Sequence, residues 1–129
     1  MMAYSYKKNG DKMSEIQHID SGARLSEATV FNNVIYTAGM VAGESLGKSV
    51  VEQTKDVLQQ IDTLLARLGS DKTRILKANI WMTDISKIAE MNEVWDAWVV
   101  AGKTPARATV EAKLANAGYA VEVMVEAAI

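Results

Sequence analysis

The 129-residue sequence lacks cysteine altogether and contains only one histidine and one proline. Without cysteine there is no disulfide framework, no thiol nucleophile and no thiolate ligand for a metal. His18 has neither a second histidine nor a suitably spaced carboxylate near it in the sequence, so we expect no metal site and no catalytic triad. Any chemistry has to come from other side chains.

An excess of charge of one sign is also missing. The 14 basic and 16 acidic residues give a formal net charge of −2, and they form no block of like charges. Such a chain lacks the electrostatic footprint of a protein that binds nucleic acid or an anionic membrane. No apolar run approaches the roughly 20 residues of a transmembrane helix, and the N-terminus lacks the apolar region of a signal peptide. These absences predict a cytoplasmic protein that binds neither nucleic acid nor membrane.

What the sequence does contain is enough hydrophobic residues, 49%, for the core of one domain of ordinary size. Residues 1–13 are mainly polar and show no hydrophobic periodicity, so we expect them to form a flexible N-terminal extension. A single domain is then expected over residues 14–129. Its first element could be a short strand within residues 15–20.

Two β-rich segments, residues 29–31 and 34–38, come next. Asn32 and Asn33 join them, and asparagine tolerates the positive φ angles of a two-residue turn. This pattern predicts a β-hairpin. Gly39 follows the second strand directly, where the missing side chain permits the close approach of another group.

A capping box marks the start of a helix at Ser49 and Glu52. A wide apolar stripe at three-and-four spacing follows, and it ends at Gly69, where a C′ glycine belongs. Residues 75–83 then alternate and predict a long strand whose apolar face carries Leu76, Ala78, Ile80 and Met82. A second helical pattern begins at Ser86 and is expected to end at Gly102.

The C-terminal residues form two strictly alternating runs, 106–114 and 121–129. The turn-forming residues 116–118 lie between them, so we predict an antiparallel hairpin. In the first run the apolar residues face one way, and Arg107 faces the other. Counting by twos places Glu122 on the same hairpin face as Arg107.

The expected order of elements is β-β-β-α-β-α-β-β. It predicts an α+β, two-layer domain in which a six-stranded mixed sheet carries both helices on one face. The other sheet face, away from the helices, would be partly apolar and partly charged, with Arg107, Thr109, Lys113 and Glu122 on it. Such a face is typical of burial against further copies of the chain, so we expect a homo-oligomer.

Several sequence runs, in this order and at these distances, resemble the RidA/YjgF family of enamine/imine deaminases over residues 14–129. No single run is specific, but the combination is. The runs are YTAG at 36–39, the EQT…VL…ID…L…G helix at 52–69, Asn92 within MNEVWDAW, PAR at 105–107 with the TVEA that follows, and VEV at 121–123. The run WDAWVVAG is similar to the YoaB-like branch of that family.

The resemblance implies a chorismate-mutase-like fold and a homotrimer with active sites at the subunit interfaces. The implied reaction is hydrolysis of reactive enamine or imine acids to 2-keto acids and ammonia. The substrates would be 2-aminoacrylate, its tautomer 2-iminopropanoate, and 2-iminobutanoate. No metal or organic cofactor is implied.

The resemblance also assigns residues. Arg107 would bind the substrate carboxylate, and Glu122 would orient the attacking water or carry a proton. The remaining substrate-binding positions would be Gly39, Ala38, Thr109, Leu25 and Asn92. Three of them depart from the family pattern: Ala38 replaces a common serine, Thr109 replaces a cysteine of several members, and Leu25 replaces a common tyrosine. These departures are expected to alter the substrate range.

Other interpretations fit the same residues. Arg107 could be a structural cross-strand partner of Glu122 or Glu126, and Glu122 could serve only to balance Arg107 and Lys113. Thr109 could offer a hydroxyl to the substrate or be present as a β-former. A non-catalytic trimer that binds small carboxylates is the alternative function. An endoribonuclease or translation inhibitor is a third, but it should combine basic and aromatic residues in a pattern that this sequence lacks.

Overall fold

A computed structural model of the single chain describes residues 15–129, so the expected extension over residues 1–13 lies outside the described part. The described chain forms two α-helices, seven strands and two short 3₁₀ helices. In chain order the elements are β1 (Gln17–Ile19), β2 (Ala28–Phe31), β3 (Val34–Thr37), β4 (Met40–Val41), α1 (Val50–Arg67), η2 (Lys72–Arg74), β5 (Ile75–Met82), η3 (Ile85–Lys87), α2 (Ile88–Trp98), β6 (Ala106–Glu111) and β7 (Val121–Ala128).

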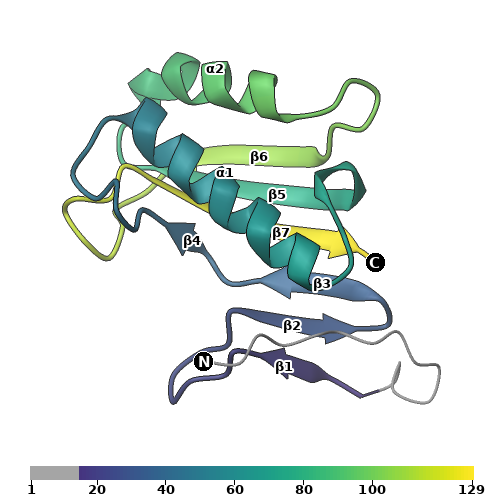
Figure 1. The fold of residues 1–129 in the computed structure, drawn as a ribbon. Coiled ribbons are helices and arrows are strands. Elements are labelled where there is room, and N and C mark those ends of the chain that lie inside the picture. The colour runs from purple at the N-terminus through teal and green to yellow at the C-terminus, as the bar shows by residue number, and fades with distance from the viewer. Residues whose placement is uncertain (1–14) are drawn as a thin grey trace.

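The strands form one mixed sheet in the order β1-β2-β3-β7-β5-β6, with β4 pairing to β7 beyond the end of β3. Both helices lie over the same face of this sheet (Figure 1). The predicted two-layer α+β arrangement is therefore confirmed. The sheet has one strand more than the predicted six, because the two residues of β4 are too few to produce an alternating pattern.

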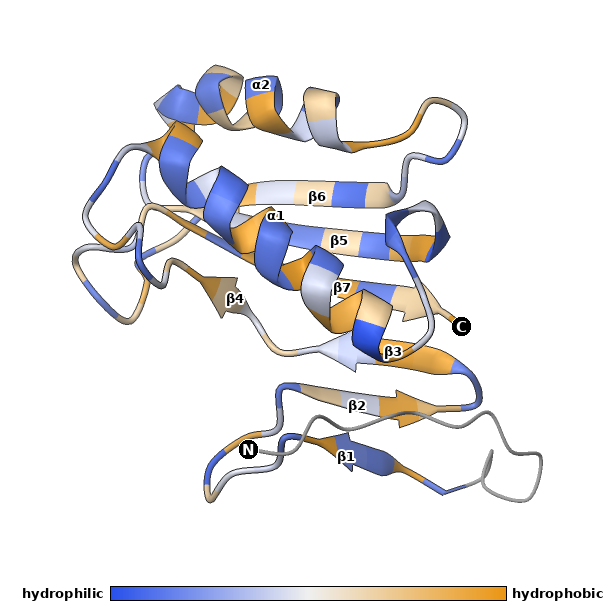
Figure 2. Ribbon diagram, in the orientation of Figure 1, coloured by the Kyte–Doolittle hydropathy of each residue, from blue (hydrophilic) through white to orange (hydrophobic). Residues whose placement is uncertain are grey.

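The core lies between the helices and the sheet. Alternate residues of β7 are buried from Val121 to Ala127, and they face the apolar stripe of α1, which includes Val57, Ile61 and Leu65. Figure 2 shows the corresponding change between hydrophobic and hydrophilic residues along α1. Each fully buried side chain of this size contributes about 1.5–3 kcal/mol relative to exposure.

The local signals for the first hairpin and the first helix are confirmed. Asn32 and Asn33 have φ angles of 50° and 63°, and they turn the chain from β2 into β3. The Ser49 hydroxyl accepts a hydrogen bond from the Glu52 amide at 3.1 Å. At the other end of α1, Gly69 has a φ of +80°, as a C′ glycine should.

The predicted C-terminal hairpin is wrong. β5 lies between β6 and β7, so that β6 runs parallel to β5 and β7 runs antiparallel to it. A parallel pair needs a crossover, and α2 supplies it between β5 and β6. Alternation in the sequence indicates which residues share a face, but it does not indicate which strands pair. α2 also ends at Trp98 instead of continuing to Gly102, because Val99 adopts an extended ψ of 158°.

The predicted orientation of β6 is also wrong, because it assumed that β6 pairs directly with β7. Arg107 pairs with Ala78 and so faces the helices, whereas Val110 pairs with Trp81 and faces away from them. The apolar residues of β6 are therefore on the helix-free face, where Val110 is 51% exposed. Leu76 was expected to share the buried face of β5, but it lies at an irregularity in the pairing and is 51% exposed.

Candidate functional site

Arg107 lies on β6, the edge strand of the sheet, and its exposed side chain reaches toward α2. Its Nη1 donates a hydrogen bond to Asn92 Oδ1 at 2.8 Å. Its guanidinium carbon lies 5.3 Å from the ring centre of Trp95. Asn92 and Trp95 are three residues apart in α2 and so project from the same side of the helix.

No carboxylate neutralises Arg107 within the described chain, where the only ion pair joins Arg67 to Asp20. The structural alternative, a cross-strand pair of Arg107 with Glu122 or Glu126, is therefore contradicted. The Arg107 guanidinium makes one hydrogen bond and has five N–H groups in a planar fork. Several of its donors remain available to an incoming anion.

Glu122 lies beside a notch in the sheet between β3 and β4. At Thr37 the chain stops pairing with β7, and it pairs with β7 again only at β4. In this gap the Thr37 hydroxyl, instead of a main-chain carbonyl, accepts a hydrogen bond from the Val125 amide at 3.0 Å. A Cβ on Gly39 would overlap the carboxylate of Glu122. Only glycine at position 39 leaves this carboxylate where it lies.

Arg107 and Glu122 lie on opposite faces of the sheet. Arg107 pairs with Ala78, and Ala78 pairs in turn with Val125, so these three side chains share the helix-covered face. Glu122 is three residues from Val125 on the same strand and points the other way. The prediction that the two groups share a face is wrong, and one chain does not bring them together.

The other predicted site residues lie near the notch at Gly39, near Arg107, or in the loop before β2. Ala38 precedes Gly39 in the notch, and its amide donates to the Glu27 carbonyl at 2.8 Å. Asn92 holds Arg107 on the edge strand β6, which is two strands away from β7. Thr109 follows Arg107 on the same face of β6, and its hydroxyl oxygen is buried without a hydrogen-bond partner in the described chain. Leu25 is 56% exposed in the loop before β2.

The helix-free face of the sheet carries exposed apolar side chains. Phe31, Tyr36 and Val110 are 37%, 41% and 51% exposed, and all three point away from the helices. The outer edge of β6 also has no strand beside it among the described residues. An apolar face next to an open edge is typical of a surface that other chains cover.

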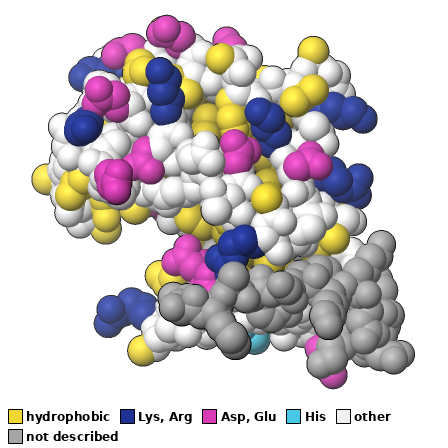
Figure 3. Space-filling model, in the orientation of Figure 1, with side chains coloured by type: hydrophobic (Ala, Val, Ile, Leu, Met, Phe, Trp, Pro, Cys, Tyr) yellow, Lys and Arg dark blue, Asp and Glu magenta, His cyan; other side chains and the backbone are white. Residues whose placement is uncertain are grey.

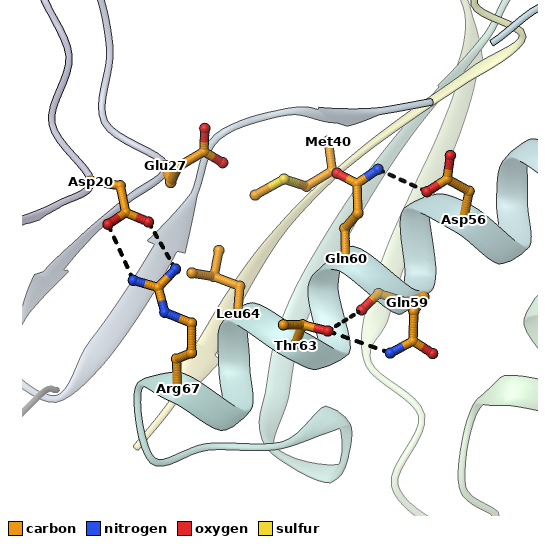
Figure 4. Close-up of a pocket in the computed structure, with 9 residues that line it drawn as sticks. All are labelled: Asp20, Glu27, Met40, Asp56, Gln59, Gln60, Thr63, Leu64 and Arg67. Atoms are coloured by element: carbon orange, nitrogen blue, oxygen red, sulfur yellow. Dashed lines mark hydrogen bonds and ion pairs between the residues drawn. The ribbon is translucent and has the colours of Figure 1, made fainter. Parts of the chain in front are cut away.

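A hollow lies elsewhere, between α1 and the loop that precedes β2 (Figure 4). It has a volume of about 470 Å³ and is lined by Asp20, Glu27, Met40, Asp56, Gln59, Gln60, Thr63, Leu64 and Arg67. The side-chain hydrogen bond from Arg67 lowers the pKa of Asp20. Asp20 and Arg67 therefore neutralise each other, and neither contacts the predicted site.

Asp56, which also lines this hollow, has a structural role. Partial burial would raise its pKa, but hydrogen bonds from the Ser45 hydroxyl, Gln60 and the amides of Gly43 and Ser45 lower it to about 2. These bonds join the loop after β4 to α1. The shift therefore reflects the anchoring of a loop and does not mark a catalytic acid.

The described residues include no group of three or more histidine, cysteine, aspartate or glutamate side chains that could hold a metal ion. Within residues 15–129, no helix has the length and apolar character that a membrane crossing needs. Figure 3 shows basic and acidic side chains interspersed over the face in view.

The arrangement of two helices over one face of a mixed sheet defines a class: small α+β domains with a chorismate-mutase-like fold. The family described as "Endoribonuclease L-PSP" matches residues 15–129, and the chain belongs to this family, which also carries the names RidA, YjgF and RutC. The resemblance in the sequence is thereby confirmed.

Individual relatives agree with this assignment. The chain is 46% identical over 110 residues to a RutC family protein of Haemophilus influenzae, covering 85% of this chain and 95% of that one. It is 45% identical over 114 residues to the RutC family protein YoaB of Escherichia coli, covering 88% and 98%. A crystal structure of a YjgF family member from Neisseria meningitidis superposes with a TM-score of 0.84 at 47% identity, covering 90% and 96%.

The contact between Arg107 and Trp95 was missed at the level of sequence. Trp95 lies on the apolar stripe of its helix, and a tryptophan at such a position is typical of a packing residue. The available signal was the spacing of Asn92 and Trp95, because two side chains at i and i+3 on a helix can approach one target together.

Proposed function

We propose that the chain hydrolyses small 2-enamine and 2-imine acids, such as 2-aminoacrylate and 2-iminobutanoate, to the 2-keto acid and ammonia. We further propose that it does so as a homotrimer with an active site at each subunit interface. The observation that carries the proposal is the guanidinium of Arg107, which is exposed at a sheet edge and lacks an anionic partner in the described chain.

A free guanidinium in this position suits a small carboxylic acid. Its planar fork can bind a carboxylate through two charge-assisted hydrogen bonds, and it stays charged at any working pH. Both the imine acid and the keto-acid product carry such a carboxylate. Asn92 and Trp95 contact Arg107 without neutralising its charge.

Glu122 supplies the second part of the proposed site. Because Arg107 and Glu122 point to opposite faces of one sheet, a site that uses both takes Arg107 from one subunit and Glu122 from another. The open edge of β6 and the exposed apolar residues of the helix-free face support such an assembly. Closed homo-oligomers commonly build sites in this way.

In the proposed mechanism Arg107 holds the carboxylate, and main-chain groups near Gly39 and Arg107 bond the imine nitrogen. Water adds to C2, and Glu122 orients that water or passes its proton toward the nitrogen. The carbinolamine then collapses, so that the C–N bond breaks, ammonia leaves and the 2-keto acid remains. Such imines hydrolyse readily in water, so positioning with modest acid/base assistance suffices without a covalent nucleophile.

Three positions adapt the site. Ala38 and Thr109 place a methyl group and a buried hydroxyl where relatives commonly have other small groups, and Leu25 supplies an exposed apolar side chain. The replacements at Ala38 and Leu25 each remove a hydroxyl group, and together they make the proposed cleft less polar. We therefore expect a preference for imines with short apolar side chains.

The endoribonuclease named in the family description would need to bind a polyanion. Binding of nucleic acid relies on several basic side chains that together neutralise phosphates. The net charge here is −2, and charges of both signs are mixed on the face shown in Figure 3. We therefore favour the reaction on a small acid.

A coupled assay tests the proposal. A pyridoxal-phosphate-dependent serine dehydratase generates 2-aminoacrylate, and the rate of pyruvate release is followed with and without the protein. Wild type should accelerate release, whereas Arg107→Gln should not. Arg74→Gln, which removes an exposed arginine at the far end of β7, is the matched control and should behave as wild type. If wild type binds pyruvate but leaves release at the buffer rate, the non-catalytic alternative is correct.

A further inference from the structure

The side chain of Arg107 has few restraints from its own strand. β6 is the edge strand, Arg107 is exposed, and its pairing partner on β5 is the small Ala78. A long flexible side chain in such surroundings populates several rotamers and loses that freedom when a ligand binds. Rapid and tight binding of a small acid would therefore require something else to hold the guanidinium.

α2 provides two contacts that differ in kind. Trp95 offers the face of its indole ring, 5.3 Å from the guanidinium carbon, and this contact uses none of the N–H donors of Arg107. Asn92 Oδ1 takes a single hydrogen from Nη1. Together they fix the plane and the rotation of the guanidinium while its remaining donors stay available.

Trp95 is itself held firmly. It is only 5% exposed, and its ring centre lies 5.3 Å from that of Trp98 at an interplanar angle of 49°. The Trp98 indole N–H donates to Asp62 of α1 at 3.0 Å. A continuous set of contacts thus connects α1 to Arg107 through two indole rings.

We infer that Trp95 is a positioning residue for the carboxylate site: its ring holds the guanidinium of Arg107 in the orientation that binds the acid. The inference rests on the proposed function for its ligand, but the contact itself can be tested separately. Because preorganisation acts on binding and not on the chemical step, loss of the ring should raise KM and the Kd for a keto acid and leave kcat nearly unchanged.

Three variants separate positioning from packing. Trp95→Phe keeps an aromatic face, Trp95→Leu removes it, and Val94→Ala makes a cavity at a buried neighbour in the same helix that is not a contact of Arg107. Pyruvate binding by calorimetry should weaken about tenfold in Trp95→Leu and less than about threefold in Trp95→Phe. Val94→Ala should lower Tm but keep the Kd. Equal Kd values in all folded variants would overturn the inference.

A nuclear magnetic resonance measurement decides the matter even if the protein binds no keto acid. The Hε resonance of Arg107, assigned by its loss in Arg107→Lys, should be shifted upfield by the ring current of Trp95. It should return in Trp95→Leu to the position seen for the exposed Arg24. If wild type fails to bind pyruvate while this shift is present, the proposed function fails and the positioning contact stands. If wild type shows no shift, the positioning role is refuted.

Discussion

Arg107 and Glu122 point to opposite faces of the same sheet, because Arg107 shares a face with Ala78 and Val125, and Glu122 is three residues from Val125. The two groups assigned to catalysis are therefore separated within one chain. A joint site requires two subunits, and the exposed apolar face and open β6 edge are the surfaces on which those subunits can meet.

The notch at Gly39 predicts a variant that damages activity more than stability. In Gly39→Ala the new methyl group overlaps the end of the Glu122 side chain, which can move without disturbing the backbone. We expect the free energy of unfolding to change by less than about 1 kcal/mol and kcat to fall by about tenfold or more. Gly43→Ala, whose added Cβ meets nothing closer than 3.9 Å, should match wild type in both measurements. Full turnover in Gly39→Ala would count against a role for Glu122.

Thr109 predicts an unusual gain in stability. Its hydroxyl oxygen is buried and has no hydrogen-bond partner in the described chain, so Thr109→Val removes an unpaired polar atom at nearly constant volume. Denaturant unfolding should show a gain of about 1 kcal/mol. In contrast Thr54→Val, which removes the bond from Thr54 Oγ1 to the Val50 carbonyl at 2.7 Å, should lose about 1 kcal/mol. A loss in Thr109→Val would mean that a water or a neighbouring subunit bonds this hydroxyl.

Gln53 predicts a large loss of stability far from the proposed site. Its buried amide donates to the carbonyls of Lys48 and Gly118 and accepts from the amide of Ala120, so it joins the start of α1 to the loop before β7. Gln53→Leu should cost about 3 kcal/mol in the free energy of unfolding, since the Lys48 carbonyl and the Ala120 amide lose their partner and the Gly118 carbonyl keeps only its bond from the Gly47 amide. The exposed Gln59→Leu is the control and should stay within about 0.5 kcal/mol of wild type. A small effect at Gln53 would show that water replaces the amide.

The low pKa of Asp56 predicts a loss of stability in acid. Although burial opposes it, hydrogen bonds from Ser45, Gln60 and Gly43 lower this pKa to about 2. Because the folded value is below the unfolded one, the contribution is fully present above about pH 4 and is lost as the pH falls toward 2. Asp56→Asn should therefore be less stable than wild type by roughly 1–2 kcal/mol at pH 7, allowing for partial exposure to solvent. The difference should shrink progressively below pH 4, and a constant difference down to pH 2 would contradict this explanation.

Much of the fold was predictable because its signals are local. The turn at Asn32 and Asn33, the Ser49 cap and the Gly69 terminus each depend on residues within a few positions of one another. Strand pairing depends on distant residues. Nothing in the alternation of residues 106–114 indicates that β5 lies between β6 and β7, and the short β4 has no period to detect.

The candidate site was predictable by residue type but not by geometry. The resemblance to the family selected Arg107, Glu122 and Gly39, and the structure finds the first without an anionic partner and the other two in contact range of each other. The face of the sheet on which each side chain lies follows from the register of β5 with both neighbours. That register is set by tertiary packing, so counting residues within each strand could not supply it.

The most direct test of the account is subunit complementation. Arg107→Gln and Glu122→Gln should each be inactive in the coupled pyruvate assay when assembled alone. Equal amounts of the two variants are then mixed, unfolded and refolded together. Some interfaces will combine an intact Arg107 from one subunit with an intact Glu122 from the next. If subunits mix at random, we expect recovery of about one quarter of wild-type activity. No recovery in mixtures whose mixed assembly is verified by mass spectrometry would contradict a site shared between subunits.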